Sequence, residues 1–473
     1  MENGIPRPHI AVMPTPGMGH LIPFAEFAKL LVDRHHFTVT IIGFSEFTNE
    51  AQEAFLDGLP YSITSVLLPP VSLSDLPADA RLETRISVAT ARSVPAIRSV
   101  LQQIQETRRL VAYIADLFGT DGFDAAKDVG VPQYVFIPTN FLFLTLMLEL
   151  PALDSVMAGE FRELADPVRL PGFVPIPGPD ILDPLQDRRN ESYRWVLHNA
   201  SRYREAEGIM VNTFVEIEPE AAKLLTAEEN GWPAVYPVGP LIRGGGAAPH
   251  EGAVESLKWL EKQPVESVLF VSFGSGGTLS PEQTTEVALG LEASGQRFLW
   301  VVRSPSEKDS SAAYFTGRSG GGDPLSQLPE GFLQRTKEVG MVVPSWAPQI
   351  DVLASAATGG FLTHCGWNST LESVVHGVPM IAWPLFAEQR MNAVSLVEGV
   401  KVALRPAASD DGMVDREEIA RVVRELMEGE EGREIRRRVK GLKEAAAAAL
   451  EEKGSSAEAI AELAKKWKSS ATA

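Results

Sequence analysis

The sequence predicts an α/β protein of two domains, each organised around a parallel β-sheet. Three observations support this fold class. The chain has 473 residues, which is too long for one hydrophobic core and long enough for two. Strand-like and helical patterns alternate in both halves, as in βαβ units. A stretch rich in Gly, Ala and Pro, residues 243–252, separates the halves and is interpreted as the linker.

The first half opens with a βαβ unit. The apolar run 9–13 is followed by a Pro/Gly-rich turn, by helical spacing over 21–32 and by a β-branched run over 38–42. Further strand-like runs lie at residues 110–115, 133–137 and 208–211. The alternation of strands with helices predicts a parallel sheet in this half.

The second half repeats the pattern. Strand-like runs occupy 268–273, 297–302 and 361–363, and the chain from 415 onward is helical. Residues 304–324 are rich in Ser, Gly and Asp without periodicity, which predicts a surface loop to which we assign no role.

Composition excludes some classes of partner. The net charge of −19 argues against nucleic acid or an anionic membrane surface as partner, because acidic side chains repel phosphates. The single cysteine, Cys365, excludes an internal disulfide framework and favours a reducing compartment. The first residues lack the features of a secretory signal, and Pro138, Asn140 and Glu149 interrupt the most apolar stretch, residues 134–153. We expect a cytoplasmic protein without membrane insertion.

The turn after the first strand, Thr15-Pro-Gly-Met-Gly-His20, is the first candidate site. Its glycines allow the backbone to approach a ligand closely, and His20 begins a helix. Asp116 follows the strand-like run 110–115, so it lies at the carboxyl end of a strand, where open α/β sheets bind ligands. Asp116 can therefore orient His20, with Asp121 and Asp124 as rival partners. The alternatives are an ordinary helix-start histidine and a helix-capping aspartate.

The second candidate site follows the strand at 361–363. His364-Cys-Gly-Trp-Asn-Ser369 leads into a helical run, residues 370–376, so a helix N-terminus is offered to an anion. Backbone N–H groups there can bind a diphosphate without a basic surface. Glu372 has the spacing of a capping box with Ser369, which is an alternative role for it. Trp346, between two prolines, is either a packed aromatic residue or a platform for a nucleobase.

A bound divalent ion is not indicated. The sequence has no D-x-D triplet and no His/Cys cluster with metal-ligand spacing. Charge on a leaving diphosphate is therefore expected to be met by protein dipoles.

These motifs together resemble those of plant family 1 UDP-glycosyltransferases. Trp346-Ala-Pro-Gln349, His364-Cys-Gly-Trp367-Asn368-Ser369, Glu372 and Glu388-Gln389 match, in order, the signature box of that family. The resemblance covers the whole chain, including Val271-Ser-Phe-Gly-Ser275, and is greatest to the hydroquinone (arbutin-forming) glucosyltransferases. It implies the GT-B fold, with two Rossmann-like domains facing across a cleft. The acceptor domain would span 1–245 with the returning helix 455–473, and the UDP-sugar domain 246–454.

The resemblance also implies a role for each matching residue. His20 is the general base and Asp116 its partner, in a direct displacement that inverts the anomeric carbon without metal or cofactor. The donor residues would be Trp346 on uracil, Gln349 and Glu372 on ribose, Ser275, His364, Asn368 and Ser369 on the diphosphate, and Trp367, Glu388 and Gln389 on the sugar, with Thr15, Gly19 and Ala347 beside them. The acceptor pocket would include Glu83, Ile86, Phe118 and Leu197.

The expected reaction is glucosyl transfer from UDP-glucose to small phenols by a monomer. Gln389 resembles glucose users, whereas Glu388 departs from the aspartate that many members have. N- or S-glucosylation remains an alternative. A nicotinamide-dependent oxidoreductase is a rival because of Gly17-x-Gly19, but its fingerprint lacks a third glycine, since Ile22 stands there. A non-catalytic UDP-sugar binder is a second rival, although it would not need His20 with a carboxylate partner.

Overall fold

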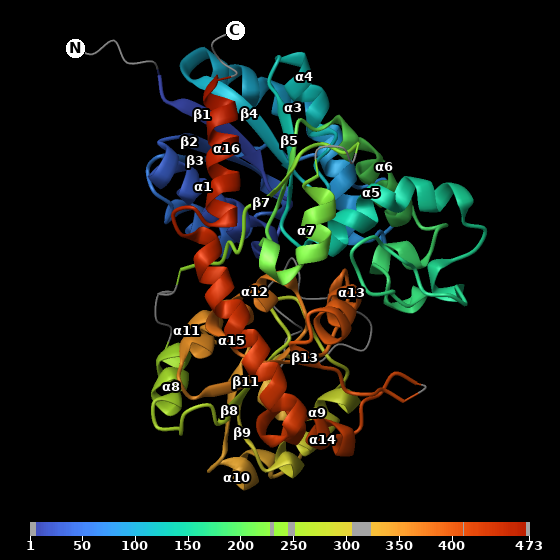
Figure 1. The fold of residues 1–473 in the computed structure, drawn as a ribbon, viewed down its shortest axis with the longest axis vertical. Coiled ribbons are helices and arrows are strands. Elements are labelled where there is room, and N and C mark those ends of the chain that lie inside the picture. The colour runs from blue at the N-terminus through green and yellow to red at the C-terminus, as the bar shows by residue number, and fades with distance from the viewer. Residues whose placement is uncertain (1–5, 228–230, 245–250, 305–322, 410, 470–473) are drawn as a thin grey trace. The chain divides into compact units, whose positions relative to one another are not determined.

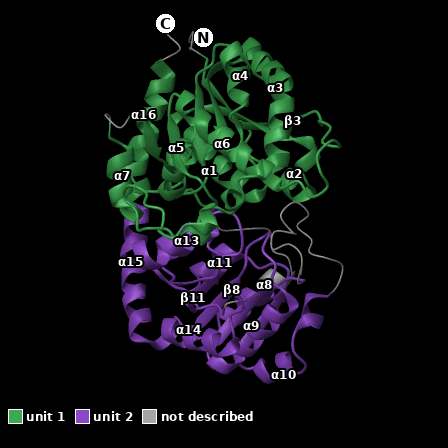
Figure 2. Cartoon of the chain, turned by 90° about the vertical axis from the view of Figure 1, so that its right-hand side faces the viewer, with its two compact units in different colours: residues 1–242, 448–473 green, residues 243–447 purple. Residues whose placement is uncertain are grey.

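The computed structural model describes residues 6–227, 231–244, 251–304, 323–409 and 411–469. The chain divides into two compact units, which Figure 2 colours separately: unit 1 is Met1–Ile242 with Ala448–Ala473, and unit 2 is Arg243–Ala447. The sequence placed these divisions at 245/246 and 454/455. Most of the predicted loop 304–324, and 245–250 of the predicted linker, lie outside the described residues.

Unit 1 contains a seven-stranded sheet in the order β3-β2-β1-β4-β5-β6-β7, and every pairing in it is parallel. Its strands are β1 Pro8–Met13, β2 Thr38–Phe44, β3 Ile63–Leu68, β4 Arg109–Asp116, β5 Gln133–Ile137, β6 Ile209–Val211 and β7 Val235–Pro237. Its longer helices are α1 Met18–His35, α2 Glu50–Asp57, α3 Leu82–Thr107, α4 Gly122–Asp128, α5 Phe141–Val156, α6 Glu191–Arg202, α7 Pro219–Leu225 and α16 Ser455–Ser469. Central strands such as β1 and β5 are apolar and buried, because helices cover parallel sheets on both faces.

The last described helix, α16, packs into the core of unit 1 (Figure 1). Trp467 is fully buried, and its indole ring meets the rings of Phe27, Phe37 and Tyr134 edge to face, at 5.3 Å between centroids for Tyr134. Such aromatic contacts add to the free energy gained by burial. Residues near the C-terminus therefore stabilise the sheet that the first residues begin.

Unit 2 contains a six-stranded parallel sheet in the order β10-β9-β8-β11-β12-β13. Its strands are β8 Val268–Ser272, β9 Arg297–Val302, β10 Gly340–Pro344, β11 Thr358–Thr363, β12 Met380–Ala382 and β13 Ala403–Leu404. Its helices are α8 Glu251–Leu260, α9 Pro281–Ser294, α10 Phe332–Thr336, α11 Gln349–Ala354, α12 Trp367–His376, α13 Gln389–Val394, α14 Arg416–Glu428 and α15 Glu430–Leu450, the last of which contains the second division between the units. None of the described helices combines the length and the apolar character needed to cross a membrane.

Both sheets reverse their strand order once, and the reversals locate the candidate sites. In unit 1, strands β1 to β3 follow one another toward one edge of the sheet, and β4 to β7 toward the other. In unit 2, strands β8 to β10 run toward one edge, and β11 to β13 toward the other. Ligands of open α/β sheets bind at such switch points, beyond the carboxyl ends of the two central strands. The turns after β1 and β4, and those after β8 and β11, are therefore where each unit is built to bind a ligand.

Candidate functional site

His20 lies in the first turn of α1, at the switch point of unit 1. The helix begins after Gly17, whose φ of 120° is a backbone conformation that glycine adopts without strain. Nδ1 of His20 lies 2.9 Å from Oδ2 of Asp116, the last residue of β4. The His20 side chain is 16% exposed, whereas that of Asp116 is fully buried. A ligand can therefore reach the histidine of this pair, whereas the carboxylate is shielded from solvent.

Asp116 is held by the backbone as well as by His20. The main-chain N–H of Thr15 donates to its Oδ2 at 2.9 Å, and that of Leu117 donates to its Oδ1 at 2.5 Å. Thr15 follows β1, which pairs with β4 up to the level of Met13 and Ala115, so the sheet register brings the two loops together. These donors fix the carboxylate in one orientation toward the imidazole.

The hydrogen bond also determines the tautomer of His20. An ionised carboxylate only accepts hydrogen bonds, so Nδ1 is the nitrogen that carries the proton toward Asp116. In the neutral ring Nε2 is then the basic nitrogen. A buried carboxylate at Nδ1 also stabilises the imidazolium that forms when Nε2 takes a proton.

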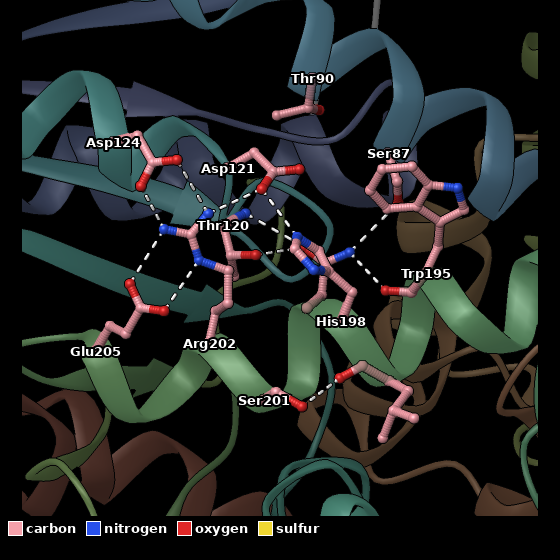
Figure 3. Close-up of polar contacts among 12 residues, drawn as sticks. Ser87, Thr90, Thr120, Asp121, Asp124, Trp195, His198, Ser201, Arg202 and Glu205 are labelled. Atoms are coloured by element: carbon pink, nitrogen blue, oxygen red, sulfur yellow. Dashed lines mark hydrogen bonds and ion pairs between the residues drawn. The ribbon is translucent and has the colours of Figure 1, made fainter.

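The rival partners Asp121 and Asp124 are engaged elsewhere (Figure 3). Oδ1 of Asp121 lies 2.8 Å from Nε2 of His198 and 2.8 Å from Arg202, while Asp124 pairs with Arg202 at 2.5 Å. Both of these partners, His198 and Arg202, lie on α6, whereas His20 lies on α1. Among the three aspartates considered, Asp116 is the one hydrogen-bonded to His20.

Asn199 ties the loop after Asp116 to two helices. Its Oδ1 accepts from the Thr120 hydroxyl at 2.7 Å and from the Thr120 main-chain N–H at 3.3 Å. Its Nδ2 donates to the hydroxyl of Ser87, on α3, at 3.3 Å and to the carbonyl of Trp195 at 2.9 Å. Figure 3 shows how Thr120, Ser87 and Trp195 converge from three elements. The buried amide thus fixes the spacing of α3, α6 and the loop.

We expect Asn199→Ala to lower the free energy of unfolding by about 1–3 kcal/mol, because buried groups of Thr120 would lose their partner. It should also lower kcat, since the loop that begins at Asp116 would lose its support. Urea unfolding and steady-state kinetics measure the two effects. The matched control is Asn190→Ala, which removes the N-cap of the same helix and costs about 1 kcal/mol. An equal fall in kcat in both variants would contradict a role specific to Asn199.

The four predicted acceptor residues all belong to unit 1 and lie on the elements that Asn199 connects. Glu83 and Ile86 are on α3, Phe118 is in the loop after β4, and Leu197 is on α6. Ile86 is fully buried, whereas the other three are half-buried. Burial is the main cause that raises the pKa of Glu83 above its usual value. This carboxyl therefore has a greater neutral fraction than an exposed glutamate.

In unit 2, His364 follows β11 and packs against glycines. A Cβ added to Gly274 would lie 2.6 Å from its ring, and one added to Gly366 would lie 2.5 Å from its Nε2. Gly274 also has a φ of 74°, which favours glycine. Burial, followed by the charge of Arg303, lowers the pKa of His364 to about 4. The ring is therefore neutral at physiological pH and can donate one hydrogen bond.

The helix after His364, α12, begins three residues earlier than the run predicted from sequence. It starts at Trp367 with Gly366 as N-cap, and no side chain caps it. Ser369 consequently lies inside the helix, and the alternative role of Glu372 in a capping box is excluded. Asn368 and Ser369 lie in the first turn, where N–H groups and the helix dipole favour an anion.

Glu372 is instead part of a hydrogen-bonded group with Gln349. Nε2 of Gln349, the first residue of α11, donates to the Glu372 carboxylate at 2.6 Å and to the Ser369 hydroxyl at 2.8 Å. Burial raises the pKa of Glu372 to about 7, against the opposing effect of that hydrogen bond. The structure thus brings together three of the residues predicted to bind the donor.

The loop after β10 exposes an aromatic ring. Trp346 is 43% exposed, although Ala347 beside it is buried. It follows Ser345, whose φ of 66° is left-handed and whose N–H donates to the Val302 carbonyl at 2.7 Å. A core aromatic residue would be buried. The exposed indole of Trp346 is therefore accessible for stacking on a nucleobase. Ser275, after β8, is also exposed.

The last predicted pair lies at the start of α13. Oε1 of the buried Gln389 accepts from the N–H groups of Leu385 and Phe386, at 2.9 and 3.0 Å. Asn392 donates to Glu388 at 3.4 Å and to the Cys365 carbonyl at 2.9 Å. Gln389 therefore shapes its own loop, and Asn392 links that loop to the one after β11.

Comparison with known proteins decides the family. A family model described as "UDP-glucoronosyl and UDP-glucosyl transferase" matches residues 242–433. The chain is 56% identical to hydroquinone glucosyltransferase of Rauvolfia serpentina over 461 residues, which is 97% of this chain and 98% of that relative. This chain belongs to the UDP-glycosyltransferase family.

Solved structures agree with this assignment. The UDP-glucosyltransferase of Polygonum tinctorium that glucosylates indoxyl, in complex with 3,4-dichloroaniline, is 50% identical, with a TM-score of 0.91 over 98% of this chain and 99% of that one. UGT2 of Phytolacca americana, with UDP-2-fluoro-glucose and pterostilbene, is 48% identical, with a TM-score of 0.90 over 98% and 100%. The predicted GT-B class of this glycosyltransferase is confirmed, and the oxidoreductase alternative is excluded.

Three residues that position the sites of this glycosyltransferase escaped sequence reasoning. Asn199 and Asn392 are isolated amides in helical segments, where nothing in the local pattern sets them apart. Gly274 lies in the turn after β8 that matches the family motif, but its contact with His364 joins residues far apart in the chain. Within the described ranges, no group of three or more His, Cys, Asp or Glu is placed to hold a metal ion.

Proposed function

We propose that this glycosyltransferase transfers glucose from UDP-glucose to the hydroxyl of a small phenol, with inversion, to give a β-glucoside. The observation that carries the proposal is the hydrogen bond between His20 and the buried Asp116, because it leaves Nε2 as a base. The names of the relatives support the substrates, since they include a hydroquinone glucosyltransferase and an enzyme solved with pterostilbene.

In the proposed step, Nε2 of His20 takes the proton from the acceptor hydroxyl. The acceptor oxygen forms a bond to the anomeric carbon as the bond from that carbon to the β-phosphate oxygen breaks, and its electron pair leaves with UDP. Asp116 stabilises the resulting imidazolium. The transition state resembles the oxocarbenium ion of glycoside hydrolysis.

In the proposal, different side chains of unit 2 bind the base, the ribose, the diphosphate and the sugar of the donor. Trp346 stacks on uracil, a contact worth about 1–3 kcal/mol. The carboxylate of Glu372 and the amide of Gln349 bind the ribose hydroxyls, and the first turn of α12 binds the diphosphate. The remaining proposed contacts are Ser275, Ala347, His364, Asn368 and Ser369 toward UDP, Trp367, Glu388 and Gln389 toward the sugar, and Thr15 and Gly19 from unit 1.

The acceptor is proposed to bind to Glu83, Ile86, Phe118 and Leu197 of unit 1. Their mainly apolar character suits an aromatic ring. We also propose that residues 1–245 with 455–473 form the acceptor domain and 246–454 the donor domain. The enzyme is proposed to act as a cytoplasmic monomer, without metal or cofactor.

An aromatic amine is a second candidate acceptor. The Polygonum tinctorium relative was solved with 3,4-dichloroaniline, which places an aniline on a protein 50% identical to this one. An aniline is a weaker acid than a phenol, but its neutral nitrogen is a better nucleophile than a neutral hydroxyl oxygen, so it makes less use of a base.

The test is an assay of released UDP with UDP-glucose and, in turn, hydroquinone, 3,4-dichloroaniline and a thiophenol. We expect the phenol to be the best substrate and its product to be a β-glucoside by NMR. Turnover confined to the aniline or the thiol would refute the phenol proposal. Absence of transfer to any acceptor, with UDP-glucose still bound, would favour a non-catalytic binder.

The pKa of Glu372 gives a prediction for donor binding. Its pKa of about 7 in the folded protein lies above the ordinary value of 4.5. The stability that this carboxyl contributes is therefore present below pH 4.5 and is lost as the pH rises through 7. Ribose hydroxyls donate to the ionised form, so uridine affinity should fall about tenfold per unit below pH 7.

Calorimetric titration with uridine between pH 5.5 and 8 measures this effect, because uridine carries no titrating phosphate. The dependence of uridine affinity on pH should disappear in Glu372→Gln, which keeps the shape of the side chain without its charge. A pH-independent uridine affinity in the wild-type protein would show that the ionised carboxylate does not hold the ribose.

A further inference from the structure

Arg303, directly after β9, is a half-buried cation, and no counter-ion for it lies among the residues that the structure describes. Its Nε is inaccessible to solvent and has no hydrogen-bond partner among the described residues. Burial lowers the pKa of its guanidinium. Glutamate partners instead raise the pKa of Arg335, Arg416 and Arg421 in the same unit. Even partial burial of a charge without a partner is unfavourable, so a guanidinium with a buried, unpartnered Nε indicates an anionic ligand.

The sheet places Arg303 beside two parts of the donor site. On one side, the Ser345 N–H donates to the carbonyl of Val302 at 2.7 Å, so the loop that carries Trp346 starts next to Arg303. On the other side, Arg303 is close enough to His364 for its charge to lower the histidine pKa.

The strand register is consistent with this position. Trp300 of β9 pairs with Val271 of β8, which in turn pairs with Leu362 of β11. Arg303 and His364 therefore both lie just beyond the carboxyl ends of their strands, at one edge of the sheet. A nucleotide that extends from Trp346 toward the first turn of α12 would pass Arg303.

We propose that Arg303 binds the diphosphate of the UDP-sugar and stabilises the negative charge that develops on it as the bond to the anomeric carbon breaks. This inference rests on the proposed function. It adds to the expectation from sequence, which assigned that charge to protein dipoles and to uncharged side chains. The guanidinium supplies a full positive charge and a fork of donors that fits phosphate oxygens. The neutral His364 beside it adds no charge but can donate one hydrogen bond to the same anion.

The test compares UDP with uridine as ligands of wild-type protein and Arg303→Gln by calorimetry. We expect UDP affinity to fall about tenfold or more, because a hydrogen-bonded charge pair is lost, while uridine affinity is unchanged. kcat should fall as well, and Arg303→Lys should recover part of both losses. The control is Arg335→Gln, which breaks an exposed ion pair with Glu292 and should change neither affinity.

The two ligands separate the possible outcomes. An unchanged ratio of UDP to uridine affinity in Arg303→Gln would overturn the inference, and so would an equal loss for both ligands, which indicates general distortion of the unit. If Arg303→Gln does not fold, the ratio of UDP to uridine affinity is measured in Arg303→Lys instead. An unchanged ratio in that variant would likewise overturn the inference. Wild-type protein that fails to bind UDP would refute the proposed function itself, which distinguishes the two failures.

Discussion

Replacing His20 with alanine is expected to lower kcat by about 10²–10⁴-fold, the usual contribution of a general base. UDP affinity should stay within about twofold of wild type, because the proposed nucleotide contacts, apart from Thr15 and Gly19, lie in unit 2. Asp116→Asn should also lower kcat, since an amide can neither stabilise an imidazolium nor fix the Nδ1 proton in the same way. Steady-state kinetics and UDP titration measure the two quantities separately.

The acidity of the acceptor provides an independent readout for His20. A nitrophenol that is ionised at the assay pH needs no base, so His20→Ala should be least impaired with it and most impaired with a weakly acidic alcohol. The control is His36→Asn, at the other end of α1, which keeps a residue that tolerates the left-handed backbone there. Turnover of the weakly acidic alcohol at the wild-type rate by His20→Ala would rule out this base.

Gly274→Ala is expected to lower UDP affinity by about 10- to 100-fold, because overpacking of a filled site costs roughly 1–3 kcal/mol. The new Cβ would lie 2.6 Å from the His364 ring, so the ring must move. Its freedom to move is small, because it also packs against Gly366 at the start of α12. The expected displacement therefore reaches the helix N-terminus proposed to bind the diphosphate.

Gly295→Ala separates steric overlap from backbone strain. Gly295 ends α9 of the same unit with a φ of 70°, close to the 74° of Gly274, but a Cβ there meets nothing within 4 Å. It should cost about 1–2 kcal/mol of stability through left-handed strain alone and leave UDP affinity unchanged. Calorimetry with UDP and thermal unfolding of both variants measure these effects. Equal losses of UDP affinity would attribute the effect to the backbone rather than to His364.

The sequence by itself determined the fold class and the places of the sites along the chain. Parallel strands covered on both faces are apolar throughout, so β1, β4, β8 and β11 stand out as runs that end in turns rich in glycine or polar residues. Those turns carry His20, Asp116 and His364. The spacing of residues 346–389 was distinctive enough to predict the family, which the relatives confirm.

Only the tertiary structure decided which of several possible partners each side chain has. The sequence favours Asp116 as the partner of His20 but leaves Asp121 and Asp124 as rivals. The register of β1 with β4 brings Asp116 to His20, whereas α6 engages the other two. Glu372 has the spacing of a capping residue, yet α12 starts earlier and Gln349 binds its carboxylate. Local patterns record which face of an element is apolar. They do not record contacts between distant segments, which packing of the whole unit selects.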